Sequence, residues 1–232
     1  MMLTYLDKTY QLPNAPLLAY PILKYMENVA REHMGPLNLN RDAVIKCYSA
    51  VWMVARTSLN FSSPALPGCP LTVRTWLRPM KRGMIIRDFE FYQNGALIGE
   101  AMQIWVLVDY IHRRMIRMDN LEALQNYPHP AVLKTQCPAR IKTPEMLSDA
   151  PSLCPSPDAV DENGHINNAS YVPLALSGLI SDQIRSLQLN YHQECFAEQT
   201  LPRKYWRDDK QLFVQLYTPQ GDAAFTLLAE FF

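Results

Sequence analysis

The sequence has little glycine and no excess of charge of either sign. Only eight glycines occur in 232 residues, and there is no Gly-x-Ser-x-Gly elbow, glycine-rich phosphate loop or His-Glu-x-x-His pair. These absences speak against a serine-hydrolase elbow, a Rossmann nucleotide site and a zinc peptidase. Lys plus Arg and Asp plus Glu each number 22. Because phosphate binding requires a marked positive excess, we expect no nucleic-acid partner.

Closely spaced cysteines and long apolar runs are missing too. The five cysteines are odd in number and scattered, which favours reduced thiols over a disulfide-stapled fold or a zinc knuckle. No apolar run approaches the roughly 18 residues of a transmembrane helix, and the first residues lack the pattern of a signal peptide. We therefore expect a cytoplasmic protein with no membrane association, metal or other cofactor.

Proline is plentiful in one region and divides the chain there. Seven of the 18 prolines fall between Asn126 and Val160, and that stretch lacks sustained periodicity, which predicts an extended connection. Hydrophobic residues make up 48% of the sequence, enough for two cores. We predict a first unit at residues 1–127, a connector at 128–151 and a second unit at 152–232.

The first unit reads as a helix followed by antiparallel strands. The apolar residues of Leu17–Met34 are spaced for a helix with one buried face. Alternating or continuous apolar patterns then predict strands at Leu71–Arg78, Met84–Tyr92 and Leu97–Asp109. Asn94-Gly95 lies between the last two and is a strong hairpin signal, because a type I′ turn requires positive φ at both central residues.

The second unit repeats this order in shorter form. A helix is predicted at Ala169–Leu187, with Asn167 or Asn168 as its N-cap, followed by a strand at Leu189–Phe196. A hairpin is predicted from Gln211–Tyr217 and Ala223–Phe231. Two copies of a helix wrapped by an antiparallel sheet predict an α+β fold of the tandem, or double, hotdog type.

The densest polar cluster is the segment Asp161–Asn168, directly before the second predicted helix. Unpaired backbone N–H groups and the helix dipole at that position could stabilise the oxyanion of a thioester carbonyl. Glu194 follows about 30 residues later, and one helix with a tight return could bring it beside His165. The alternative is that the cluster is only a turn and a helix cap, where Asn, Asp and Gly are common.

Glu194 and Cys195 are adjacent on the predicted strand, so their side chains should face opposite ways unless a bulge intervenes. Only one of them can then enter a shared site with His165. Cys195 could be a small buried hydrophobe, and Glu194 an ordinary exposed strand residue.

These motifs resemble those of the acyl-acyl carrier protein (acyl-ACP) thioesterase family. Asp161–Tyr171 is similar to its signature Asp-x-Asn-x-His-x-Asn-Asn-x-x-Tyr, and Leu189–Cys195 to its second motif, apolar-x-Tyr-x-x-Glu-Cys. The first unit also follows the family's order, with Arg87-Asp88, the hairpin, Ala101-x-x-x-Trp105-Val106, then Asp109 and Arg113-Arg114. The resemblance implies a double hotdog fold and the release of free fatty acids from acyl carrier protein.

Carried over by position, the resemblance implies a catalytic set of Asp161, Asn163, His165 and Glu194. We prefer Glu194 acting with His165 to activate water over a nucleophilic Cys195, because a tuned carboxylate can act as general base without an acyl-enzyme. Asn163 would orient the thioester or donate to the oxyanion, and Asp161 would hold the loop. Further substrate contacts are expected from Asn167, Asn168, Tyr171 and Trp105.

The first unit is expected to be catalytically degenerate, because Asn14 stands where His165 stands in the second. It would supply structure and much of an acyl tunnel, with Tyr25, Met26, Val29, Met53 and Trp105 as lining candidates or plain core residues. Arg113, Arg114 and Arg117 could dock an acidic carrier protein or merely form a solvated strand end. A homodimer is plausible, since hotdog sheets can pair.

Two other functions stay open on the sequence. One is an acyl-CoA thioesterase, which would bind the CoA 3′-phosphate in a basic pocket. The other is a hotdog module that binds acyl chains without hydrolysing them, although it would have no need for Asn163, His165 and Glu194 together.

Overall fold

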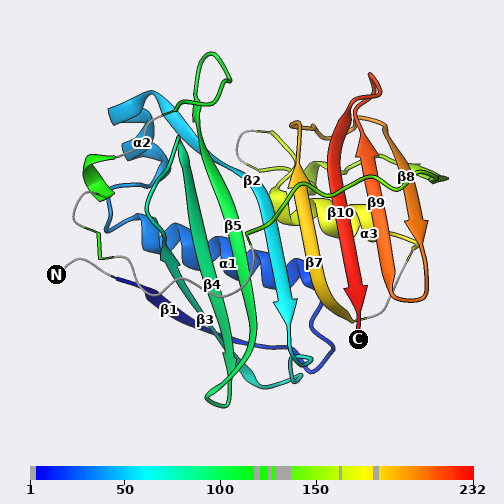
Figure 1. Ribbon diagram of the computed structural model, residues 1–232, viewed down its shortest axis with the longest axis horizontal. Coiled ribbons are helices and arrows are strands. Elements are labelled where there is room, and N and C mark those ends of the chain that lie inside the picture. Colours follow the sequence, from blue (N-terminus) through cyan, green and yellow to red (C-terminus); the bar gives the residue numbers. More distant parts are fainter. Residues whose placement is uncertain (1–3, 118–120, 125–126, 129–136, 162–163, 180–182) are drawn as a thin grey trace.

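The structure is a computed structural model of the chain. It describes all residues except 1–3, 118–120, 125–126, 129–136, 162–163 and 180–182. Within the described part, one ten-stranded antiparallel sheet has the strand order β1-β3-β4-β5-β2-β7-β10-β9-β8-β6 (Figure 1).

The helices are α1 (Ala19–Met34), α2 (Arg41–Tyr48) and α3 (Tyr171–Leu176), with 3₁₀ turns at Glu122–Leu124, Pro157–Ala159 and Asn168–Ser170. The strands are β1 (Leu6–Gln11), β2 (Ala50–Phe61), β3 (Pro70–Leu77), β4 (Met84–Gln93), β5 (Ala96–Asp109), β6 (Ser148–Leu153), β7 (Ile184–Tyr191), β8 (Leu201–Arg207), β9 (Gln211–Tyr217) and β10 (Ala223–Phe231). None of the described helices is long and apolar enough to cross a membrane.

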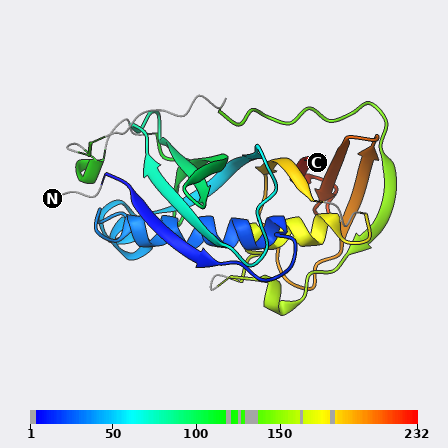
Figure 2. The same ribbon diagram turned by 90° about the horizontal axis from the view of Figure 1, so that it is seen from below.

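The two halves of the chain share the sheet at the pair β2–β7. β2 pairs with β5 of its own half on one side and with β7 of the second half on the other, from Arg56 opposite Asn190 to Asn60 opposite Ser186. The helices α1 and α3 lie along the same face, roughly end to end (Figure 2). Each half is therefore a helix wrapped by antiparallel strands, and the predicted double hotdog fold is confirmed.

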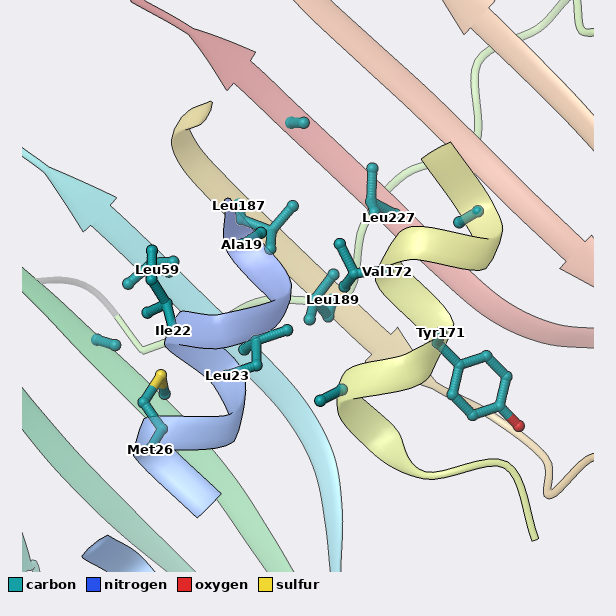
Figure 3. Close-up of a cluster of buried hydrophobic side chains, with 14 of the residues drawn as sticks. Ala19, Ile22, Leu23, Met26, Leu59, Tyr171, Val172, Leu187, Leu189 and Leu227 are labelled. Carbon is teal, nitrogen blue, oxygen red and sulfur yellow. The ribbon is translucent and has the colours of Figure 1, made fainter. Parts of the chain in front are cut away.

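The core runs without a break across this junction. On α1, Leu23 and Met26 are buried and point into the sheet, and on α3 Val172 does the same (Figure 3). They belong to one cluster with Leu187 and Leu189, the inward residues of β7. Because the same apolar cluster covers both halves, burial of these side chains holds the two helices over the β2–β7 pair.

The predicted elements of the first half are confirmed. The helix begins at Ala19, two residues after the expected start, so that Pro21 lies in its first turn, where a missing N–H is tolerated. β3, β4 and β5 match the expected ranges within a residue or two. Asn94 and Gly95 have φ values of 51° and 78°, as a type I′ turn requires.

The long second helix predicted at Ala169–Leu187 is wrong. α3 ends at Leu176, Gly178 follows with φ 69°, and β7 already begins at Ile184. Leu187 and Leu189 are both fully buried, so their spacing is the two-residue period of a strand. The expected strand over Leu189–Phe196 likewise starts earlier and stops at Tyr191.

Residues 137–147, in the connection between the halves, cross the face of the sheet opposite the helices (Figure 2). There the Ile141 N–H donates to Asn190 Oδ1 at 2.8 Å, and Arg56 donates to the Pro138 carbonyl at 3.4 Å. The segment ends in β6, which pairs with β8 at the far edge of the sheet. β6 begins at Ser148, inside the range expected for the connector, and the division into three parts stays a prediction.

Candidate active site

A tight loop presents His165. The Asp161 N–H donates to the His165 carbonyl at 2.7 Å, and the His165 N–H donates to Asp161 Oδ1 at 3.2 Å. Gly164 allows the reversal because its φ is 77°, a value that side chains disfavour. Asn163 lies outside the described residues. The loop therefore closes on itself and fixes the backbone from which the imidazole projects.

The chain segment after β7 lies alongside this loop. His165 forms an isolated antiparallel bridge with Phe196, and the Ile166 N–H donates to the Cys195 carbonyl at 2.8 Å. Just after β7, the N–H groups of His192 and Gln193 both donate hydrogen bonds to the Ala224 carbonyl oxygen, with N···O distances of 2.9 and 3.2 Å. Two successive donors on one acceptor break the alternation of a regular strand.

This arrangement brings His165 and Glu194 together. Nδ1 of His165 lies 3.3 Å from Glu194 Oε1, and the two side chains are 20% and 29% exposed. The Phe196 ring packs edge-on against the imidazole, with ring centroids 5.0 Å apart. A half-buried imidazole and carboxylate in contact form a pair that can accept, hold and return a proton.

The first half adds a charge to this pair. Arg113, in the turn after β5, forms an ion pair with Glu194 through Nη2 and Oε2. Sequence reasoning assigned Arg113 only a possible docking role. The one signal that could have found the contact is the family pattern itself, in which Arg113-Arg114 and Glu194 both occur.

Cys195 points away from the pair, into the core. Cys195 is fully buried in the main apolar cluster, and its backbone N–H donates to the Tyr171 hydroxyl at 3.2 Å. Burial raises the pKa of the Cys195 thiol, and a thiol held protonated is a poor nucleophile. The side chains of Glu194 and Cys195 thus face opposite ways, as expected. The alternation of a regular strand is not the reason, because β7 ends at Tyr191, before both residues.

The other residues expected near the substrate have structural contacts. Asn167 Oδ1 caps the start of the 3₁₀ turn by accepting from the Ala169 N–H at 3.0 Å, and its amide donates to Glu27 of α1 at 3.3 Å. Asn168 is exposed, and Tyr171 is buried and stacked on Phe225 at 4.9 Å. Burial raises the pKa of Tyr171 well above its ordinary value.

Trp105 lies in the first half, on β5. Its indole N–H donates to Gln103 Oε1 at 2.9 Å, and the Arg87 guanidinium lies 5.3 Å from its ring centroid. Of the tunnel candidates, Met26 and Val29 are fully buried in the core. Among the residues that the structure describes, no group of three or more His, Cys, Asp or Glu side chains could hold a metal ion.

The fold is shared with solved structures of known class. An acyl-ACP thioesterase from Bacteroides thetaiotaomicron superposes with a TM-score of 0.89 at 16% identity, over 99% of this chain and 98% of that one. The 12:0-ACP thioesterase from Umbellularia californica gives a TM-score of 0.81 at 16% identity, over 100% and 98% of the two chains. At such identities the matches define the class by fold, the tandem hotdog.

Sequence comparison supports the same resemblance. Residues 15–127 match the model of the acyl-ACP thioesterase N-terminal domain. The chloroplastic acyl-(acyl-carrier-protein) hydrolase FATB2 from Cuphea viscosissima is 22% identical over 201 residues, which cover 78% of this chain and 48% of the relative. The chain thus spans about half the length of this curated relative. The resemblance to the acyl-ACP thioesterase family is confirmed, and in the first half residues 15–127 are similar to that family's N-terminal domain.

Proposed function

We propose that this protein hydrolyses the thioester of acyl-ACP and releases a free fatty acid, with Glu194 as the general base. The observation that carries the proposal is the contact of His165 Nδ1 with Glu194 Oε1 at 3.3 Å, beside the β2–β7 pair that joins the halves. The printed name of the FATB2 relative, an acyl-ACP hydrolase, supports the reaction and the carrier.

The proposed reaction needs one base and no covalent intermediate. The Glu194 carboxylate accepts a proton from water while the water oxygen attacks the thioester carbon. The tetrahedral intermediate then collapses, the carbon–sulfur bond breaks, and the departing thiolate takes the proton from Glu194. With its own proton on Nδ1, His165 donates to Oε1 and keeps the carboxylate aligned.

The oxyanion of that intermediate needs a hydrogen-bond donor. The N–H groups of Ala169 and Ser170, at the start of the second-half helix, already donate to Asn167. They are therefore not available in the way the sequence suggested. We assign the donor role to the Asn163 amide, as the family resemblance implies, and the Asp161 hydrogen bonds to His165 hold the loop that carries both residues.

The carrier is proposed to dock beside the turn after β5. Arg114 and Arg117 are exposed in that region, near the Arg113 contact to Glu194. Cationic side chains around the entrance would attract an acidic carrier protein and speed its encounter. The homodimer and the cytoplasmic location stay predictions, the former to be checked by light scattering on the purified protein.

Hydrolysis of matched acyl-ACP and acyl-CoA series by the purified protein tests the carrier. We expect kcat/KM to be at least about tenfold higher for acyl-ACP, because docking energy adds to that of the shared acyl and pantetheine groups. A preference for acyl-CoA would support the alternative thioesterase. Tight binding of both series without turnover would support the non-catalytic module.

A further inference from the structure

We propose that Arg113 is a positioning residue for Glu194, so that the first half completes the active site of the second. The inference rests on the proposed role of Glu194 as general base. It goes beyond that role because it assigns a function in the reaction to a residue 81 positions earlier in the chain.

The turn that carries Arg113 is built to hold its backbone in place. Asp109 Oδ1 accepts from the N–H groups of Ile111 and His112 at 2.9 and 2.6 Å, and the Arg113 N–H donates to the Asp109 carbonyl at 3.0 Å. These bonds, the one from His112 above all, lower the pKa of the Asp109 carboxyl. Arg113 itself has φ 55°, a left-handed conformation that bulky residues adopt only where the surroundings require it.

The two carboxylate oxygens of Glu194 have different partners. Oε1 contacts His165 Nδ1 at 3.3 Å, and Oε2 is bound by the Arg113 guanidinium. Glu194 follows the end of β7 at Tyr191, so no regular strand ladder fixes its backbone. With one oxygen held by Arg113, the carboxylate plane is fixed and the other oxygen is directed at the imidazole.

The exposure of the pair argues against a role in stability. The Arg113 and Glu194 side chains are 40% and 29% exposed, and ion pairs at such positions contribute little to folding. Orientation of a catalytic base, by contrast, responds strongly to small displacements. Loss of Arg113 should therefore reduce the rate of the chemical step and leave the fold intact.

Arg113 could instead serve only to bind the carrier protein, and the choice of substrate separates the two roles. An acyl-N-acetylcysteamine thioester contains the reacting bond but no carrier. A docking residue changes KM for acyl-ACP and leaves this small substrate unaffected, whereas a positioning residue lowers kcat for both.

The experiment measures kcat and KM on both substrates for Arg113→Ala, Arg113→Lys, Glu194→Gln and the double variant Arg113→Ala/Glu194→Gln. Arg74→Ala is the matched control, because Arg74 on β3 also forms an exposed pair, with Asp7 on the edge strand β1 at 2.8 and 2.9 Å. Circular dichroism confirms that each variant is folded.

We expect Arg113→Ala to lower kcat about 10- to 100-fold on both substrates, with KM within about threefold. Arg113→Lys should recover part of the loss, Arg74→Ala should match the parent, and the double variant should be no slower than Glu194→Gln. Normal turnover of the small thioester by Arg113→Ala, or losses that multiply in the double variant, would overturn the inference alone. An active Glu194→Gln would overturn the proposed general base as well.

Discussion

At the scale of single residues, one contact of the candidate site could be predicted from the sequence and another could not. His165 and Glu194 were expected to share a pocket because their types and motifs fit a thioesterase, and the structure places them 3.3 Å apart. Arg113 was not expected beside them. A contact across 81 residues depends on how two sheets join, and no local pattern encodes that.

Arg87 is a second residue whose environment could not be predicted from the sequence. It is fully buried, donates to His33 Nδ1 and to the Thr75 hydroxyl at 3.1 Å, and has no described hydrogen-bond partner for Nε or Nη2. Desolvation by burial lowers the pKa of Arg87 to about 9. A buried cation with unsatisfied donors destabilises the folded state.

We therefore expect Arg87→Met to leave the free energy of unfolding unchanged or to raise it by about 1–4 kcal/mol at pH 7, as replacement of buried ionic groups by apolar ones often does. The folded-state pKa lies below the ordinary value, so the unfolded state binds more protons above about pH 9. The parent should then gain stability as the pH rises through about 9, and the difference between the two proteins should shrink. Urea unfolding at pH 7 and pH 10 measures this, and a variant several kcal/mol less stable at pH 7 would contradict it.

At the scale of elements, the sequence predicts those whose periodicity and turn chemistry agree. α1 has a single apolar face, and the β4–β5 hairpin has an Asn-Gly turn. The prediction of a long second helix failed because the apolar residues Leu176, Ile184 and Leu187 are equally compatible with a short helix followed by a strand. β2, a central strand of 12 residues, was not predicted. It is defined by its pairing with β5 and β7, and these contacts are not visible in its local sequence.

Gly83 lies between β3 and β4 and packs against Ile116, just after the turn that carries Arg113. Its φ is 76°, and a Cβ there would lie 2.0 Å from the Ile116 carbonyl oxygen. Gly95 has a similar φ of 78° but nothing within 4 Å of its Cβ position. The two glycines therefore separate the effect of backbone conformation from that of a steric clash.

We expect Gly95→Ala to lower the free energy of unfolding by about 1 kcal/mol, from the left-handed conformation alone. Gly83→Ala should lower it by about 2 kcal/mol or more, because the segment at Ile116 must also move. It should also reduce turnover, since that segment follows the Arg113 turn. Chemical denaturation of both variants is the measurement, and equal losses would show that the close approach at Ile116 has no energetic effect.

At the scale of the whole molecule, the tandem arrangement could be predicted from the repeated order of helix and strands. The way in which the two halves meet could not be predicted, because the pairing of β2 with β7 and the shared core involve residues more than a hundred positions apart. That junction also places the catalytic candidates, since Glu27 contacts Asn167 and Arg113 contacts Glu194 across it.

The first-half position equivalent to the proposed catalytic His165 is an asparagine, so we predict one active site per chain. Asn14, at the position equivalent to His165, is exposed before α1, with its side chain close to Gly68. We expect Asn14→Ala to keep kcat within about threefold of the parent, whereas His165→Ala should lose about 10²–10⁴-fold. Steady-state hydrolysis of acyl-ACP compares them, and a collapse of turnover in a folded Asn14→Ala would contradict the single-site account.

The central claim is that Glu194 activates water and that Cys195 is a core residue. Single-turnover hydrolysis of acyl-ACP by Glu194→Gln and Cys195→Ala tests it most directly, because the two residues are adjacent but face opposite ways. Glu194→Gln should lose about 10²–10⁴-fold in rate, roughly 3–5 kcal/mol of barrier. Cys195→Ala should keep most of the rate and lose about 1 kcal/mol of stability. An inactive, folded Cys195→Ala beside an active Glu194→Gln, with an acyl group trapped on the Cys195 thiol of the parent, would contradict the claim.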